Sequence, residues 1–305
     1  MEPFEIGKSC LDSGDFTSAI RHFTEAIRLS PREPSGYVYR GCAHGKCGNF
    51  SDAIPDFNEA VRLDRNDAFS YYCRGLAYDR VGKSSEAIAD FTKAIQINPE
   101  YADAYFYRGC IYVDGDYKKA LADFSEAIRL DSSNVNAYYN RGWIYKEQGL
   151  LDEAIADFNE AIQRDPKHVN AYAHRGMAYG KKGIFDKAIA DLTETIRLDS
   201  RDPRAHRNRA VAYVKTGNPD NAISDLNEAI RLDANDAVAY YHRGCAFEQK
   251  GVLDKALADL TDAIRLNQSD ALNYYQRGVV YDKLGERSKA AADFAQAKWF
   301  GYTAK

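Results

Sequence analysis

The chain has 305 residues, of which 28% are charged, and its formal net charge of −4 gives no basic excess that would point to nucleic acid. Apolar residues make up 45%, but no uncharged apolar run approaches the roughly 20 residues needed to cross a membrane. The first ten residues, MEPFEIGKSC, lack the apolar core of a secretory signal. The six cysteines show no CxxC and no regular spacing, which fits a reducing compartment better than a disulfide framework. We therefore expect a cytoplasmic protein.

A small residue recurs along the whole chain with a nearly constant spacing. The step is 34 residues, except between Gly109 and Gly142, where it is 33. The nine positions are Gly7, Gly41, Gly75, Gly109, Gly142, Gly176, Ala210, Gly244 and Gly278. Self-similarity at a fixed period of this size is typical of repeat architectures. In chain order it predicts nine units: 1–33, 34–67, 68–101, 102–134, 135–168, 169–202, 203–236, 237–270 and 271–305.

Each unit has the pattern of two helices. In 135–168, apolar residues recur at three- and four-residue steps before and after Gly149, and Asp165-Pro166 ends the unit. Proline lacks a donor and disfavours helix in the preceding residue, so it marks the boundary physically. Pro55 is expected in the first turn of a second helix, where its missing N–H costs nothing. One hairpin cannot bury its apolar faces alone, whereas stacked hairpins can.

This pattern resembles the tetratricopeptide repeat: an aromatic residue, a small residue and a tyrosine in the first helix, then Ala-x3-Phe, alanine and proline. Two positions depart from the family pattern. Tyrosine replaces the usual first tryptophan, and arginine precedes the glycine where a leucine is common. The resemblance implies an all-α fold, a right-handed superhelical solenoid of about nine antiparallel helix hairpins forming one domain over residues 1–305. It also implies that peptides bind on a concave surface lined by the first helices.

The stretch CAHGKC at residues 42–47 contains three side chains that could ligate a metal. At about 100° per helical residue, however, Cys42 lies roughly 160° from His44 and 140° from Cys47, so the three do not converge. His44 also occupies a slot that is aromatic in most units. We expect no metal site and no cofactor. Cys42, Cys73 and Cys110 can still neighbour one another across successive units, but we interpret the cysteines as small apolar fillers rather than as a redox or metal cluster.

Eight units place an arginine before the small residue and an aspartate in the second helix, whereas the first unit has Ile6 and His22 instead. Because both residues are present or absent together, we expect a contact between the two helices of each hairpin. The predicted pairs are Arg40/Asp56, Arg74/Asp90, Arg108/Asp123, Arg141/Asp157, Arg175/Asp191, Arg209/Asp225, Arg243/Asp259 and Arg277/Asp293. Arginines with their own carboxylates favour a structural role over a phosphate-binding ladder.

The slot just before each arginine should face the groove. From residue 140 onward it holds polar side chains that can donate or accept a hydrogen bond: Asn140, His174, Asn208, His242 and Gln276. This is similar to the asparagine ladder that holds peptide backbone in other superhelical arrays, although a solvated groove lining explains the slot about equally well. Aromatic residues Tyr72, Tyr107 and Trp143 are expected nearer the N-terminus, and basic residues Lys181, Arg204, Arg207 and Lys215 in the middle.

These features favour a non-enzymatic adaptor that binds an extended peptide or partner segment in its groove. The basic residues would favour an acidic segment or a C-terminal carboxylate. A self-assembling scaffold that associates weakly through its terminal repeats is the alternative. No nucleophile elbow, phosphate loop or His-Glu metal motif points to an enzyme. We expect a protein partner and no binding to nucleic acid or membranes.

Overall fold

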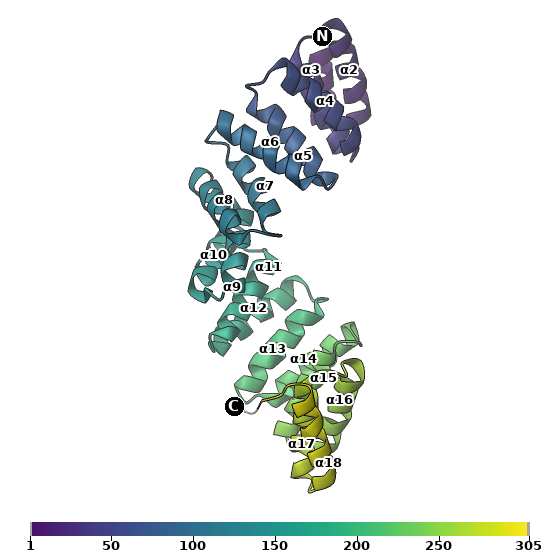
Figure 1. The fold of residues 1–305 in the computed structure, drawn as a ribbon, viewed down its shortest axis with the longest axis vertical. Helices are drawn as coiled ribbons and strands as arrows, with labels where there is room; N and C mark the ends of the chain where they lie inside the picture. The colour runs from purple at the N-terminus through teal and green to yellow at the C-terminus, as the bar shows by residue number, and fades with distance from the viewer. Residues whose placement is uncertain (1, 304–305) are drawn as a thin grey trace. The chain divides into compact units, whose positions relative to one another are not determined.

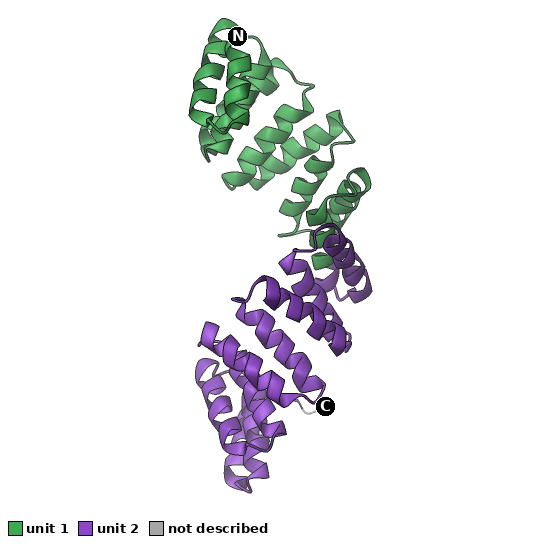
Figure 2. Ribbon diagram, turned by 180° about the vertical axis from the view of Figure 1, so that it is seen from behind, with its two compact units in different colours: residues 1–144 green, residues 145–305 purple. Residues whose placement is uncertain are grey.

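The computed structural model describes residues 2–303 and contains eighteen α-helices and no strand within that range. Figure 1 shows them as successive hairpins. The residues group into two compact units, residues 1–144 (unit 1) and residues 145–305 (unit 2), which are coloured separately in Figure 2. All-α repeat structure is therefore confirmed, while a single domain over residues 1–305 stays a prediction.

Unit 1 contains four complete hairpins and the first part of a ninth helix. Its helices are α1 (Pro3–Asp12), α2 (Phe16–Leu29), α3 (Pro34–Lys46), α4 (Phe50–Leu63), α5 (Ala68–Arg80), α6 (Ser84–Ile97), α7 (Ala102–Tyr112) and α8 (Tyr117–Leu130), and the division between the units falls within α9 (Val135–Glu147). The 33-residue step has a visible cause, because α7 has 11 residues where α5 has 13. The connection from α7 to α8 (113–116) has four residues where that from α5 to α6 (81–83) has three, so the missing residue is lost at the C-terminal end of α7 and the turn after Tyr112 is not itself shortened.

Unit 2 continues the same pattern of alternating first and second helices. Its helices are α10 (Leu151–Arg164), α11 (Val169–Lys181), α12 (Phe185–Leu198), α13 (Pro203–Lys215), α14 (Pro219–Leu232), α15 (Ala237–Gln249), α16 (Leu253–Leu266), α17 (Ala271–Lys283) and α18 (Arg287–Trp299). Within each unit, a first helix packs against its own second helix, and that second helix packs against the first helix of the next hairpin. Each first helix of unit 2 from α11 onward also approaches the next first helix.

Two glycine positions shape most of the hairpins. Gly183 ends α11 with a φ of 76°, a left-handed conformation that glycine adopts without a Cβ penalty. Gly75 instead permits close packing, because a Cβ there would lie 2.8 Å from Cε1 of Phe91. Phe91 is fully buried among Ala87, Ala94 and neighbouring tyrosines. The repeated small residue therefore makes room for the aromatic or leucine side chain of the second helix.

The prediction for Pro55 was wrong. Helix α4 begins at Phe50, so Pro55 lies in its second turn rather than its first. There the missing N–H removes one helical hydrogen bond, to the carbonyl of Ser51. The helix nevertheless continues to Leu63, with Ala53, Phe57 and Ala60 buried on one face.

The predicted arginine–aspartate pairs form wherever both residues lie in the same unit. Seven pairs are bidentate, with shortest nitrogen–oxygen distances of 2.6 to 2.7 Å. Each aspartate is buried and each arginine is partly buried. Arg141 and Asp157 belong to different units, so that pair stays a prediction. The arginines of these seven pairs are held by protein carboxylates, which leaves no phosphate ladder.

Each arginine also has a second partner, which the sequence analysis did not anticipate. Its Nη1 donates to a threonine, asparagine or serine in the second helix of the preceding hairpin, over 2.6 to 3.2 Å. The acceptors are Thr24, Asn58, Thr92, Ser125, Asn159, Thr193, Asn227 and Thr261. All but Thr24 stand two residues after a paired aspartate in the sequence, which is the signal that could have revealed them. The arginine thus joins consecutive hairpins as well as the two helices of one hairpin.

Candidate functional site

Four predicted groove residues of unit 2 lie at the same position of successive first helices: His174 on α11, Asn208 on α13, His242 on α15 and Gln276 on α17. All four are partly exposed. Within residues 2–303, Asn208 and Gln276 make no side-chain hydrogen bond, so their amides are available to a ligand. An amide offers both a donor and an acceptor, which suits an extended backbone.

Three predicted residues, Lys181, Asn208 and Lys215, line one cavity of about 330 Å³ between α11, α12 and α13. We call it the unit 2 pocket. Its full lining is Gly176, Met177, Gly180, Lys181, Phe185, Ala188, Leu192, Asn208, Val211, Ala212 and Lys215. Most of these side chains are apolar, so the pocket has an apolar floor with two cations and one amide among its walls.

The cations of this region differ in availability. Lys181 and Lys215 are exposed and make no ion pair with any residue that the structure describes. Arg207 is bound to Asp236, with 2.5 Å between Nη1 and Oδ2, and the carboxylate is buried. Arg204 is 72% exposed and pairs with Asp202 at 3.0 Å. The charge that can attract an acidic ligand therefore comes from the two lysines rather than from the arginines.

The two groove histidines are neutral at neutral pH. Burial, together with the nearby Lys146 cation, lowers the pKa of His174 to about 4. Burial also lowers the pKa of His242 to about 4, with the Arg207 guanidinium adding to the effect. A neutral imidazole has one donor and one acceptor nitrogen. These residues thus contribute hydrogen-bonding capacity to the groove but no charge.

In unit 1, the predicted residues are mostly packed against neighbours. Tyr72 lies 4.9 Å from Tyr101 and 5.9 Å from Tyr107, measured between ring centroids. Trp143 packs edge-on against Tyr117 at 6.1 Å. These contacts place Tyr72 and Trp143 beside the core clusters, although both remain partly exposed. Asn140, also in unit 1, contacts a cysteine: its Nδ2 lies 3.7 Å from Sγ of Cys110.

Tyr107 does reach a cavity, of about 270 Å³, which we call the unit 1 pocket. Its full lining is Gly41, Cys42, Gly45, Lys46, Phe50, Phe57, Cys73, Leu76, Ala77, Arg80 and Tyr107. In the repeat register this pocket is the counterpart of the unit 2 pocket. Lys46 occupies the repeat position equivalent to Lys181, and Arg80 the position equivalent to Lys215. Both pockets therefore have two cations over an apolar floor.

A glycine distinguishes the two hairpins that contribute to these pockets. Gly45 and Gly180 occupy the slot four residues after the repeated small residue, and a Cβ at Gly180 would meet only another Cβ, at 4.0 Å. The seven other units fill this slot with a larger side chain: Leu11, Asp79, Val113, Lys146, Val214, Glu248 and Asp282. The missing side chain leaves space beside the first helix. This signal was present in the sequence, and the sequence analysis missed it.

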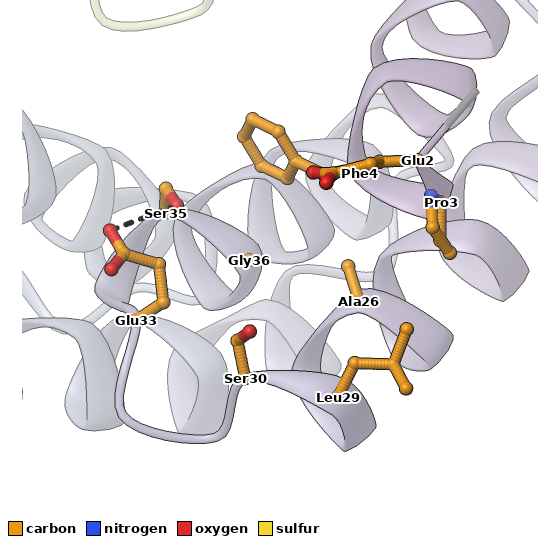
Figure 3. Close-up of a pocket in the computed structure, with 9 residues that line it drawn as sticks. All are labelled: Glu2, Pro3, Phe4, Ala26, Leu29, Ser30, Glu33, Ser35 and Gly36. Carbon is orange, nitrogen blue, oxygen red and sulfur yellow. Dashed lines mark hydrogen bonds between the residues drawn. The ribbon is translucent and has the colours of Figure 1, made fainter.

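A further cavity, of about 390 Å³, lies at the N-terminal hairpin and contains none of the predicted residues. Figure 3 shows its lining, which is Glu2, Pro3, Phe4, Ala26, Leu29, Ser30, Glu33, Ser35 and Gly36. Its two carboxylates give it the opposite charge from the two pockets above. Ser35 donates its hydroxyl to Glu33 over 3.4 Å, which occupies one of these groups.

Among residues 2–303, no group of three histidine, cysteine, aspartate or glutamate side chains is arranged to hold a metal ion. Over the same range, every helix is too short or too polar to cross a bilayer.

The fold and the pockets define an α-helical repeat protein with cavities between the helices of neighbouring hairpins. Sequence models described as tetratricopeptide repeat match residues 4–70, 68–101, 135–168, 175–237 and 237–270, and one described as TPR repeat matches 112–149. The chain belongs to the tetratricopeptide repeat family, which makes it a protein-interaction module. A comparison with curated proteins gives no match.

Solved structures of this family resemble the chain. YrrB, described as a TPR protein with an unusual peptide-binding site, is 26% identical with a TM-score of 0.53, over 60% of this chain and 95% of YrrB. MamA is 31% identical with a TM-score of 0.50, over 53% of this chain and 95% of MamA. The C-terminal part of a TPR repeat-containing protein from Cytophaga hutchinsonii has a TM-score of 0.64 at 16% identity, over 78% and 98% of the two chains, and it supports the fold alone.

Proposed function

We propose that this chain binds an extended segment of a partner protein along its first helices, as a non-enzymatic adaptor working in the cytoplasm. The carrying observation is the unit 2 pocket, where an apolar floor lies between two lysines that have no ion pair among the described residues. One apolar side chain of the partner enters the pocket, and an adjacent carboxylate lies between Lys181 and Lys215. Asn208 binds the backbone of the same segment.

Charge and size favour this kind of ligand. The whole chain carries a net charge of −4, so the two lysines form a local cationic site on an acidic protein. Opposite charge at a recessed site raises the encounter rate and orients the ligand. A cavity of about 330 Å³ is at the lower end of the range for ligand pockets and fits a side chain better than a whole cofactor. The peptide-binding site described for YrrB supports the same class of ligand.

A screen of fluorescein-labelled random nonapeptides against the full chain tests the proposal. We expect the selected peptides to share an apolar residue next to aspartate, glutamate or the C-terminus. Lys181→Ala combined with Lys215→Ala should weaken their binding at least tenfold. Gly180→Val introduces the side chain that Val214 supplies one repeat later, and it should abolish binding by filling the pocket.

Lys182→Ala is the matched control, because Lys182 is paired with Asp152 and does not line the pocket. It should leave the affinities unchanged. The circular dichroism spectrum of every variant must match that of the wild type. If the selected peptides lack acidic groups, or if the lysine and glycine variants bind them as the wild type does, the assignment of this pocket fails.

Self-association through the terminal repeats is a second candidate, and one observation favours it. Trp299, at the end of α18, is 82% exposed, which is unusual for a large aromatic side chain. Sedimentation equilibrium over a hundredfold range of concentration tests it. We expect the wild type to show a concentration-dependent mass that Trp299→Ser lowers to that of the monomer. A monomeric wild type at every concentration would exclude this scaffold function.

A further inference from the structure

Two cysteines of consecutive repeats meet in the unit 1 pocket. Sγ of Cys42, on α3, lies 3.9 Å from Sγ of Cys73, on α5. Both residues line the pocket, together with the cations of Lys46 and Arg80. The two residues are 31 positions apart in the sequence, so the stacking of the hairpins brings the thiols together. The interpretation of these cysteines as mere fillers does not account for this pairing.

The surroundings of the two sulfurs differ in a way that assigns them separate roles. Cys42 is partly exposed, whereas Cys73 is 8% exposed. A hydrogen bond from the Cys73 thiol lowers the pKa of Cys42 most strongly, and the Lys46 ammonium lowers it further, against the effect of burial. The same hydrogen bond and burial raise the pKa of Cys73. A thiolate is the reactive form of cysteine, so Cys42 is the nucleophile of the pair.

Two other partly buried cysteines lack this activation. Burial raises the pKa of Cys110 to about 12 and that of Cys245 to about 11, which keeps both thiols protonated at neutral pH. Neither lines the unit 1 pocket.

We propose that Cys42 and Cys73 form a reversible disulfide when the protein meets a hydroperoxide. The Cys42 thiolate attacks one oxygen of hydrogen peroxide, the O–O bond breaks, and a sulfenic acid forms as hydroxide leaves. Cys73 then attacks the Cys42 sulfur, the S–O bond breaks, and the S–S bond forms. The departing hydroxides take the two thiol protons and leave as water. Two thiols lose two electrons in total, and one peroxide becomes two waters.

The required movement is small. A disulfide holds its sulfurs about 2.05 Å apart, so the present separation of 3.9 Å must close by roughly 1.9 Å, which side-chain rotation and a slight approach of α3 and α5 can provide. The bond would join the second and third hairpins covalently. Because both sulfurs line the unit 1 pocket, it would also change the shape of the cavity that Tyr107 and Leu76 help to line. The proposal does not depend on what that pocket binds.

The sequence allows a direct assay. Trypsin cleaves after Arg40, Lys46, Arg65 and Arg74, so Cys42 and Cys73 fall in peptides 41–46 and 66–74, and exposed Cys47 falls in a different peptide. The reduced full chain is treated with one equivalent of hydrogen peroxide, alkylated and digested without reductant. We expect the 41–46/66–74 cross-link as the main product, its loss after dithiothreitol, and a higher Tm for the oxidised protein.

Single variants separate the two roles. Cys73→Ser should leave a sulfenic acid at Cys42 that dimedone traps, and Cys42→Ser should leave Cys73 unoxidised under the same conditions. Cys110→Ser, the control, should form the cross-link at the wild-type rate. If the serine variants fail to fold, alkylation of the wild type tests the proposal instead. Peroxide must then protect both thiols from alkylation to the same extent. The proposal is overturned if Cys42 pairs mainly with Cys47, or if Cys42 and Cys73 are oxidised no faster than Cys245.

Discussion

The Arg175 guanidinium joins three helices of unit 2 and thereby links two consecutive hairpins. Its Nε and Nη2 donate to Asp191 on α12 over 2.8 and 2.6 Å, and its Nη1 donates to Asn159 on α10 over 2.6 Å. The side chains of Arg175 and Asp191 are 17% and 8% exposed. Truncating Arg175 to alanine should therefore weaken both the hairpin and its junction with the preceding one.

The expected magnitudes differ between the two contacts. A hydrogen bond to a charged group contributes about 1.5–3 kcal/mol, and two such bonds reach Asp191, but the desolvation of both ions offsets much of this. We expect a coupling energy of about 2 kcal/mol between Arg175 and Asp191. Asn159 is neutral and exposed, so its single bond should give about 1 kcal/mol or less.

Double-mutant cycles with Arg175→Ala, Asp191→Asn and Asn159→Ala measure these couplings. Repeat arrays do not always unfold in two states, so amide hydrogen exchange, which resolves local opening, is preferable to a single global transition. A coupling of 2 kcal/mol corresponds to about a 30-fold change in the opening equilibrium of α12, and 1 kcal/mol to about fivefold. No coupling to Asp191, or a larger coupling to Asn159 than to Asp191, would refute this account of the clamp.

Two further perturbations test the packing and the groove. Gly75→Ala should destabilise the fold by about 1–2 kcal/mol, because its Cβ would meet Phe91 at 2.8 Å, whereas Gly180→Ala, in open space, should not lower the urea midpoint. His174 and His242 have a depressed pKa of about 4 in the folded state, whereas an unfolded histidine has a pKa of about 6.5. Between these two pH values the unfolded state therefore binds more protons than the folded state. Stability should therefore fall as the pH drops from 7.5 to 5.5, and replacing both histidines by glutamine should flatten this part of the urea-midpoint profile.

The fold was predictable because the same pattern of packing residues recurs nine times in the sequence. The spacing of Gly75 and its counterparts located every hairpin, and the one 33-residue step located the irregular hairpin, although it did not show that the first helix α7 is the shortened part. The bidentate pairs were predictable because arginine and aspartate are absent together from the first unit. Pro55 was misplaced because helix starts are set by capping and packing at the exact residue, which a periodic pattern does not resolve.

The site was less predictable because it depends on which side chains pair with one another in the folded chain. Arg207 and Lys215 look equally basic in the sequence, but only the structure shows that Asp236 neutralises the arginine. Tyr72 and Tyr107 were likewise both predicted to face the groove, yet Tyr107 lines the unit 1 pocket and Tyr72 does not. The periodicity of the sequence predicts which face of a helix a residue lies on. Whether its side chain is free to bind a ligand depends on neighbours from the adjacent repeat.

In a repeat protein, departures from the consensus therefore carry the functional information. The shared residues are committed to packing: glycine makes room for phenylalanine or leucine, and arginine is bound on both sides. What can differ between units is the slot four residues after the small residue, and glycine there opens a pocket beside two cations in both units of the fold. One such hollow contains an amide at Asn208 and the other a thiol at Cys73. The same geometry thus recurs at two places in the chain with different side chains, so we expect the two pockets to differ in the groups that they accept.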